Sequence, residues 1–355
     1  MLTPRFLRLT RPLSTLFEYS DAFGSSHSLP FPESALRFGR YQLSTSLYIF
    51  STDLRFPTII SVLYISVVIF CNKINARERR PWAISRTKVF PNLVILHNLI
   101  LTVFSAWTFA VMLNTLSSAW PDKQDELHMS RAADIVCHGG QFPGHESYAP
   151  RLKMIVWLFY LSKLYEPLDT VIILAKGRQA SALHIYHHAG VIFWGCMGVR
   201  FINSASIIAT LFNSAVHTLM YTYYSMTALR IPVHHSTKAS LTLLQIVQFF
   251  VGSLLGLSSV LVEYDVPFSG PPLERHDQSP STPFNITPRG SKVQQSRDMK
   301  TVRCVRDSSE AYAVCLGCGF VLFLMLLFLK FYVQSYLQHW PPHKKAVLRN
   351  LGFMG

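Results

Sequence analysis

The 355-residue sequence has little charge. Only 15% of its residues are Asp, Glu, Lys or Arg, whereas a soluble domain carries about a quarter. Acidic residues are fewer than basic ones, 19 against 33, so the formal net charge is +14. Half of the residues are hydrophobic, and several apolar runs reach about 20 residues, enough to cross a bilayer core. These proportions exclude an ordinary soluble domain and predict an all-α polytopic membrane protein.

Cysteine is also scarce, and what is missing around it excludes further classes. Six cysteines in a chain of this length do not make a disulfide scaffold. Cys315 and Cys318 lack the second pair that a structural zinc site needs. The basic residues cluster in short loops beside apolar runs and form no stripe with interleaved aromatic residues, so nucleic acid is not an expected partner.

The hydropathy pattern predicts seven transmembrane helices. Their ranges are about 56–72, 90–114, 152–175, 183–200, 203–228, 239–262 and 311–335. The chain then divides into an N-terminal tail, a six-helix region that holds the polar motifs, a loop, the seventh helix and a C-terminal tail, at residues 1–55, 56–262, 263–310, 311–335 and 336–355. Pro167 inside the third span predicts a kink there.

Lysine and arginine in the short loops set the expected orientation. The loop after the first span is rich in them, whereas the loop after the second span is acidic. The N-terminus is therefore expected in the lumen and the C-terminus in the cytosol. The loop 263–310 is then lumenal, its Pro-, Ser- and Gln-rich composition predicts disorder, and its Asn285 begins a glycosylation pattern. Cys137 and Cys304 fall on the same oxidising side and are candidates for a disulfide.

Charged residues recur inside the third predicted span. Lys163, Glu166 and Asp169 lie three residues apart on one broad helix face, with Thr170 beside them. Burying such charged groups in lipid costs free energy, so they rarely occur there without a functional role. An ion pair that only fixes helix packing would explain one pair, but not three charges followed by a histidine cluster.

That cluster opens the fourth span. His184, His187 and His188 share one side of a helix, at positions i, i+3 and i+4. Two chemistries use such an arrangement: metal binding by neutral imidazoles, and acid–base or nucleophilic catalysis. The residues alone leave both open.

The fifth and sixth spans add further polar groups. These are His217, Tyr221, Tyr223 and Tyr224 in the fifth span, and Thr242, Gln245 and Gln248 in the sixth. Interfacial tyrosines and interhelical glutamines are each ordinary on their own. In the expected orientation, however, all these groups and the two preceding motifs lie at the cytosolic end of the bundle. That predicts one catalytic site open to a water-soluble substrate, with an apolar bundle beyond it for a long chain.

These motifs resemble those of the ELO family, the elongases of very-long-chain fatty acids. The family patterns KxxExxDT, HxxHH, NxxxHxxMYxYY and TxxQxxQ match, in order, residues 163–170, 184–188, 213–224 and 242–248. Asn98 in the second span, after His97, also resembles an asparagine of the family. The resemblance implies an acyltransferase, a very-long-chain 3-oxoacyl-CoA synthase. It would condense long-chain acyl-CoA with malonyl-CoA to give 3-oxoacyl-CoA, CO2 and CoA, the first step of fatty acid elongation.

The resemblance also implies an architecture, a location and partners. Six of the seven helices would form a barrel around an acyl tunnel, in the membrane of the endoplasmic reticulum. Malonyl-CoA and acyl-CoA would be the substrates, with no bound cofactor and no metal. Other enzymes of the elongation cycle and a second copy of the chain, in a homodimer, are the expected protein partners.

Roles for the residues follow from the same resemblance. His187 would attack the acyl thioester to give an acyl-imidazole enzyme; direct condensation with histidine acting only as a base is the alternative. The catalytic residues would be His184, His187, His188 and His217. The substrate-binding residues would be Lys163, Glu166, Asp169, Thr170, Asn213, Tyr221, Tyr223, Tyr224, Gln245 and Gln248.

Two other classes share part of the pattern. A di-iron desaturase or hydroxylase also carries HxxHH, but its chemistry needs three histidine boxes, and this chain has one full box. Ile231 stands where the leading histidine of a box with His234 and His235 would be. A seven-helix receptor or transporter would not explain four polar motifs at one depth.

Overall fold

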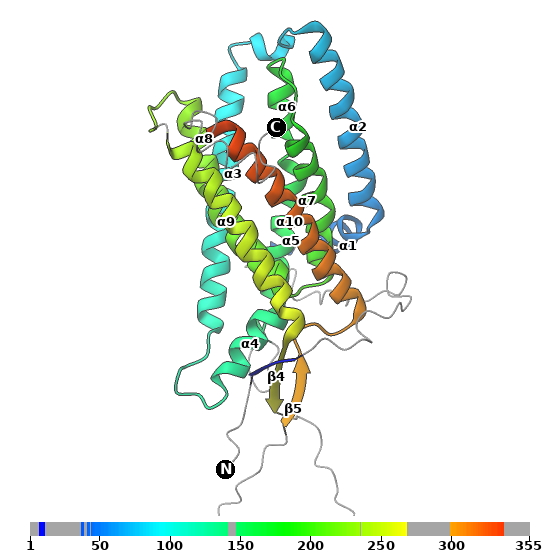
Figure 1. The fold of residues 1–355 in the computed structure, drawn as a ribbon, viewed down its shortest axis with the longest axis vertical. Helices are drawn as coiled ribbons and strands as arrows, with labels where there is room; N and C mark the ends of the chain where they lie inside the picture. Colours follow the sequence, from blue (N-terminus) through cyan, green and yellow to red (C-terminus); the bar gives the residue numbers. More distant parts are fainter. Residues whose placement is uncertain are drawn as a thin grey trace, which may run out of the picture.

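The computed structural model describes residues 7–10, 37–38, 41–42, 44–140, 147–234, 236–267 and 299–336. These form an elongated helical bundle with a small β-sheet at one end (Figure 1). Helices α1 to α10 span Thr45–Thr52, Arg55–Glu78, Phe90–Ala119, His128–His138, Ala149–Tyr165, Leu168–Ala175, Ala182–Arg200, Ser204–Ala228, Ser236–Ser258 and Ser308–Tyr336. Strands β1 to β5 span Leu7–Leu9, Arg37–Phe38, Tyr41–Gln42, Val262–Pro267 and Met299–Arg303.

Four helices in the described part of the chain are long and apolar enough to cross a membrane. They are α2, α3, α10, and α9 with the 3-10 turn that continues it to Leu261. The three other predicted spans also coincide with helices, α5 with α6, α7 and α8. Those helices are shorter or less apolar than the four above. The break between α5 and α6 shortens the first, histidines lower the hydropathy of α7, and hydroxyl residues lower that of α8. The mostly helical bundle fits the expected membrane protein.

The predicted third span is two helices. Helix α5 ends at Tyr165 and α6 begins at Leu168, with Glu166 and Pro167 between them. The kink expected at Pro167 is therefore confirmed, since proline has no backbone N–H and its ring clashes with the preceding helical turn. Glu166 stands at this break, and only 1% of its surface is exposed.

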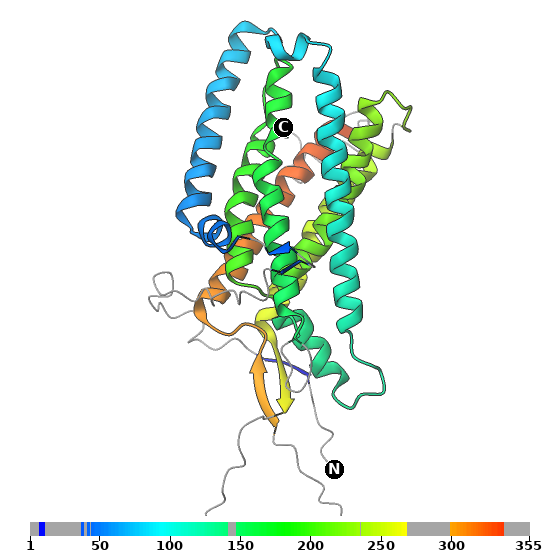
Figure 2. The same cartoon turned by 180° about the vertical axis from the view of Figure 1, so that it is seen from behind.

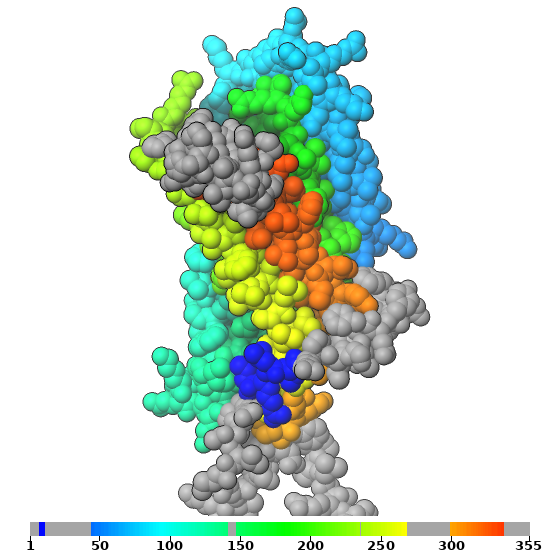
Figure 3. Space-filling model, in the orientation of Figure 1, coloured from blue at the N-terminus to red at the C-terminus, as the bar shows by residue number. Residues whose placement is uncertain are grey.

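Six helices pack in a closed ring. Helix α3 contacts α8, α8 contacts α9, α9 contacts α10, α10 contacts α7, α7 contacts α5, and α5 contacts α3. Figures 2 and 3 show the bundle from behind and α9 against α10 on its front face. Helix α2 packs on α7 and α6. The ring brings residues from helices far apart in the sequence around a shared interior.

The bundle has two distinct ends (Figures 1 and 2). The α2–α3 connection, the end of α6 and the α8–α9 turn lie at one end, and α4, β4 and β5 lie at the other. We call these the basic end and the disulfide end. The basic end takes its name from the loop after α2, which holds Arg79, Arg80 and Arg86. At this end the Ser181 side chain caps α7 by accepting a hydrogen bond from the N–H of His184.

Two helices lie where the sequence predicted only tail or loop. Helix α1 falls within the expected N-terminal tail 1–55, and α4 falls in the loop after the second span. Helix α1 is ordered by the apolar core: Trp157 donates a hydrogen bond to Ser51 Oγ, and Tyr160 donates one to the Ser51 carbonyl, both at 2.9 Å. Such tertiary contacts are not visible in the local sequence pattern.

The loop 263–310 is ordered at both ends, and the prediction of disorder was wrong there. Strand β4 pairs antiparallel with both β1 and β5. Ion pairs cross the strands, Arg303 with Glu263 at 2.6 Å and Arg8 with Asp265 at 3.1 Å. Pairing satisfies the backbone and brings opposite charges together, which polar composition alone does not reveal. Residues 268–298, with the predicted glycosylation site Asn285, and the predicted tail from residue 337 onward lie outside the described residues.

A disulfide joins Cys137 of α4 to Cys304, directly after β5, and this confirms the predicted pairing. The Tyr264 ring packs beside it. The Tyr264 hydroxyl donates a hydrogen bond to Asp134 at 2.8 Å and contacts His138. Burial and the neighbouring Asp134 raise the pKa of Tyr264, so this hydroxyl stays protonated and remains a donor.

Loss of this disulfide is expected to destabilise the fold. Cys137 and Cys304 are 167 residues apart, so their link strongly restricts the unfolded chain. Cys304→Ser should lower stability by about 2–4 kcal/mol, measured as a lower melting midpoint of the detergent-solubilised protein. Cys71→Ser, at a free and half-buried cysteine of α2, is the matched control. Equal midpoints for the two variants would contradict the expectation.

Candidate active site

The predicted polar motifs line one cavity of about 820 Å³. Residues of α3, α6, α7, α8, α9 and α10 surround it. Thirteen of the fourteen residues predicted to be catalytic or substrate-binding lie at this cavity or its margin. Those that line it are Glu166, Asp169, His184, His187, His188, Asn213, His217, Tyr221, Tyr223, Tyr224, Gln245 and Gln248. Lys163 lies at the margin, where it contacts two of them.

Lys163 and Glu166 form a buried ion pair. The Lys163 ammonium donates to Glu166 Oε1 at 2.6 Å and to Asn213 Oδ1 of α8 at 2.9 Å. It also lies 4.3 Å from the centre of the Phe159 ring, within cation–π range. Lys163 and Glu166 are 3% and 1% exposed, so the pair fixes the α5–α6 break against α8 in a water-poor environment.

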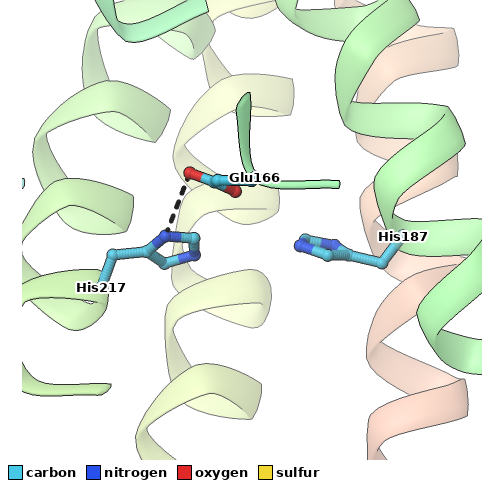
Figure 4. Close-up of side chains that lie close together, drawn as sticks. All are labelled: Glu166, His187 and His217. Atoms are coloured by element: carbon cyan, nitrogen blue, oxygen red, sulfur yellow. Dashed lines mark ion pairs between the residues drawn. The ribbon is translucent and has the colours of Figure 1, made fainter. Parts of the chain in front are cut away.

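Glu166, His187 and His217 point toward one another from three elements (Figure 4). Glu166 Oε1 lies 3.5 Å from Nδ1 of His217, an ion-pair distance without hydrogen-bond geometry. Ligand atoms of all three residues lie within 4.8 Å of one another, so their donor set suits a transition metal. The Lys163 ammonium on the same Glu166 oxygen opposes a second cation there.

The three histidines of α7 stack along one side of the helix. The rings of His184 and His188 are 4.4 Å apart between centres, and those of His187 and His188 are 5.2 Å apart. His188 is 3% exposed and faces the Tyr64 ring of α2. His187 is thus held between a packed neighbour and the acidic group at Glu166.

Asp169 belongs to a second network. Its Oδ1 lies 2.9 Å from Nε2 of His97, and its Oδ2 accepts a hydrogen bond from the Tyr221 hydroxyl at 2.7 Å. Nδ1 of His97 lies 3.2 Å from the Tyr165 hydroxyl. This pattern assigns the ring proton to Nε2, which donates to Asp169, and leaves Nδ1 to accept from Tyr165. The network joins α3, α5, α6 and α8 beside the cavity.

Thr170 is placed differently from the sequence prediction. It is 1% exposed, hydrogen-bonds to Tyr64 at 2.8 Å, and lines neither of the two cavities described here. In this structure Thr170 packs α6 on α2 through Tyr64, and a contact with substrate stays a prediction.

A second cavity of about 200 Å³ adjoins the first. The two share His187, Asn213, Gln248 and Phe249 as lining residues. Apart from these, the second cavity is lined mainly by apolar and small residues of α5, α7, α8, α9 and α10. His187 therefore stands at the boundary between a larger cavity, which carries the polar motif residues, and a smaller, more apolar one.

Comparison with known proteins decides the family. A family model described as "ELO: GNS1/SUR4 family" matches residues 49–344, most of this chain. The chain belongs to the ELO family. The resemblance predicted from the four motifs is confirmed.

Individual relatives within the ELO family match part of their lengths. The chain is 31% identical over 202 residues to "Fatty acid elongase sre1" of Dictyostelium discoideum, over 56% of this chain and 68% of that protein. It is 29% identical over 182 residues to "Very long chain fatty acid elongase 2" of Mus musculus, over 50% and 57%. It is 33% identical over 123 residues to "Very long chain fatty acid elongase 4" of Homo sapiens, over 33% and 38%. The chain thus spans about two thirds or less of these relatives. No solved structure matches it.

The structure adds residues to this ELO site that the sequence did not single out. His97 completes the Asp169 network, although the sequence pattern drew attention to its neighbour Asn98. Tyr64 holds Thr170 through a hydrogen bond of 2.8 Å. A histidine inside an apolar span was the available signal for His97. No local signal marks Tyr64.

Proposed function

We propose that this ELO-family chain is a fatty acid elongase that condenses acyl-CoA with malonyl-CoA. One observation carries the proposal: His187 lies where the larger cavity, which the polar motifs line, meets the smaller and more apolar one. A soluble CoA thioester can reach it from the first cavity, while the hydrocarbon chain is accommodated in the second. This juxtaposition suits a thioester whose two ends differ sharply in polarity.

The first half of the reaction is acyl transfer to the enzyme. A nitrogen of the His187 imidazole attacks the thioester carbonyl, the C–S bond breaks, and the CoA thiolate leaves with the proton that the imidazole loses. His217, beside Glu166, is placed to handle this proton. The product is an acyl-imidazole enzyme with the chain already in the apolar cavity, so one hard step becomes two easier ones.

The second half forms the carbon–carbon bond. Malonyl-CoA loses CO2, and the resulting carbanion attacks the acyl carbonyl of the acyl-imidazole. The C–N bond breaks, the imidazole takes up a proton from water in place of the one that left with CoA, and 3-oxoacyl-CoA is released. Direct condensation, with histidine acting only as a base, is the alternative for the same residues.

Three lysines at the first cavity suit the phosphates of CoA. Lys176 at the end of α6, Lys238 at the start of α9 and Lys330 of α10 all line it and are exposed. Ammonium groups on separate helices would hold a polyanion at the mouth while its thioester reaches His187.

Charge reversal at Lys238 is expected to raise the KM for malonyl-CoA about tenfold, equivalent to about 1.4 kcal/mol, with little change in kcat. Lys73→Glu is the matched control, because Lys73 is exposed on α2 near the same end but lines neither cavity. Steady-state kinetics at two ionic strengths measure the effect. Equal KM values for the two variants would remove Lys238 from the CoA site.

The same proposal includes the membrane arrangement. The ring of α3, α8, α9, α10, α7 and α5–α6 would be the six-helix barrel around the acyl tunnel, with α2 as the seventh span. The basic end would face the cytosol and the disulfide end the lumen of the endoplasmic reticulum, with the N-terminus lumenal and the C-terminus cytosolic. Association with other elongation enzymes and homodimer formation remain predictions.

Glycosylation tests this orientation. If the loop after β4 is lumenal, glycosidase treatment of the protein from microsomes should increase its gel mobility, and Asn285→Gln should abolish the shift. Thr287→Ala, which breaks the same pattern without touching the asparagine, should behave like Asn285→Gln. A shift that persists in both variants, or none in the wild type, would contradict use of this site.

The activity itself is tested in a host that lacks its own elongases. Membranes containing the chain should extend a series of acyl-CoA substrates when labelled malonyl-CoA is supplied, and the product profile reports the preferred chain length. Absence of malonyl-CoA-dependent extension with every acyl-CoA would overturn the proposal. Oxygen-dependent desaturation together with tightly bound iron would instead favour a di-iron enzyme.

A further inference from the structure

Helix α2 lies outside the ring of six helices, yet a buried asparagine near its end holds the turn between α6 and α7. Asn75 is 3% exposed, and its side-chain amide donates hydrogen bonds to the carbonyls of Leu174 at 2.9 Å and Arg178 at 2.8 Å. Its Oδ1 accepts a hydrogen bond from Nε1 of Trp82 at 2.9 Å. Both the amide nitrogen and the oxygen of this side chain are therefore engaged.

The two carbonyls that Asn75 binds flank one residue, Lys176. Leu174 lies two residues before Lys176, and Arg178 lies two residues after it. Carbonyls at the C-terminal end of a helix lack partners within the helix, so a side-chain donor is needed to satisfy them. The Asn75 amide thus ties together both sides of the turn that presents Lys176.

The loop after α2 packs against the same turn. The N–H of Trp82 donates a hydrogen bond to the Ala175 carbonyl at 2.9 Å. Gly177 has a φ of +73°, and an added Cβ there would lie 2.8 Å from the carbonyl oxygen of Arg80. Both the backbone conformation and the close approach require glycine at this position. The backbone around Lys176 is therefore fixed by α2 and by the loop that follows it.

A second asparagine of α2 holds the other end of this connection. Asn72, one turn before Asn75, donates a hydrogen bond to the Ala180 carbonyl at 2.9 Å and accepts one from the Ala180 N–H at 2.8 Å. Ala180 precedes Ser181, whose side chain caps α7. The start of the histidine helix is therefore anchored by bonds that do not involve Asn75.

We infer that Asn75 is a positioning residue for the substrate: it holds the turn from which Lys176 binds a phosphate of CoA. This inference rests on the proposed acyl condensation. Lys176 lines the first cavity and is exposed, so on an unrestrained turn it would lose backbone as well as side-chain freedom when it binds a phosphate. By fixing the backbone on both sides of Lys176 in advance, Asn75 lowers this entropic cost of binding.

The test is a double-mutant cycle with Asn75→Leu and Lys176→Ala. Each single change should raise the KM for malonyl-CoA about tenfold, close to the effect of losing one hydrogen bond to a charged group. The kcat should change little in Asn75→Leu, because Asn72 still holds the start of α7. The double variant should also show an increase of about tenfold, and not about a hundredfold, because Asn75 acts through Lys176.

Asn92→Leu is the matched control. Asn92 is exposed in the first turn of α3, at the same basic end, and lines neither cavity, so this variant should keep the wild-type KM. If Asn75→Leu does not accumulate in the membrane, Gly177→Ala carries the test, because its Cβ would push the turn away from the Arg80 carbonyl. Gly177→Ala should raise the KM in the same way, and only while Lys176 is present.

The outcomes separate this inference from the proposed function. If the wild type extends acyl-CoA and Asn75→Leu keeps its KM, the inference is overturned and the proposed function stands. The same holds if Asn92→Leu raises the KM equally, or if Asn75→Leu raises it as much without Lys176 as with it, since the effect would then be general damage. If the wild type extends no acyl-CoA at all, the proposed function fails, and the inference fails with it.

Discussion

Replacement of His187 by alanine is expected to lower the condensation rate by at least about 10³-fold, as loss of a nucleophile or essential base does. The change removes the side chain at the junction of the two cavities, opposite Glu166 and His217. Within the described part of the chain, Nδ1 of His187 is buried without a hydrogen-bond partner, so the change breaks no bond at that atom. The variant should therefore still accumulate in the membrane and elute as the wild type does after detergent extraction.

A control histidine separates this effect from general damage. His234 is exposed near the α8–α9 turn and lines neither cavity, so His234→Ala should retain wild-type activity. Near-normal condensation by His187→Ala would remove His187 from the chemistry altogether.

CoA release with acyl-CoA alone distinguishes the two mechanisms. If an acyl-imidazole forms, the wild type should release about one CoA per site before malonyl-CoA is added, and His187→Ala should release none. Absence of this burst in an active wild-type enzyme would favour direct condensation, with His187 as a base. The same experiment thus tests the residue and its role separately.

Local sequence patterns predicted much of the helical framework. Apolar runs located the helices of all seven predicted spans, and the missing N–H of Pro167 located the break between α5 and α6. These features depend on residues close together in the chain. The pairing of β4 with β1 and β5 does not, because β1 lies more than 200 residues before β4 and β5 follows β4 only after a long loop. Composition therefore suggested disorder where long-range pairing gives order.

The site was predicted from the spacing of the motifs and from the energetic cost of charged groups in apolar spans. The spacing could not show which groups contact one another. Buried charge in an apolar span singled out Lys163, Glu166 and Asp169. Because these three residues share one helical face, they were expected to form a single cluster. Instead, Glu166 pairs with Lys163, and Asp169 pairs with His97 and Tyr221. Glu166 stands at the break between α5 and α6, whereas Asp169 lies in the first turn of α6.

The Lys163–Glu166 pair leads to the largest expected effect on stability. Lys163→Met removes the ammonium and leaves the Glu166 carboxylate buried, with His217 at 3.5 Å as its remaining neighbour. Breaking a buried pair in this way costs about 3–5 kcal/mol, because the desolvated charge loses its partner. The variant should show a much lower melting midpoint in detergent and a reduced yield of monodisperse protein.

The double variant Lys163→Met, Glu166→Gln distinguishes an unpaired charge from lost packing. The double variant removes the desolvation cost of both buried charges together with the attraction between them. Most of the stability should therefore return, while condensation stays impaired. Lys73→Met, at an exposed position of α2, should melt as the wild type does. If the single and double variants melt alike, the loss comes from the lysine stem and its contact with Phe159, and the ion pair does not explain why these charges are kept in the bundle.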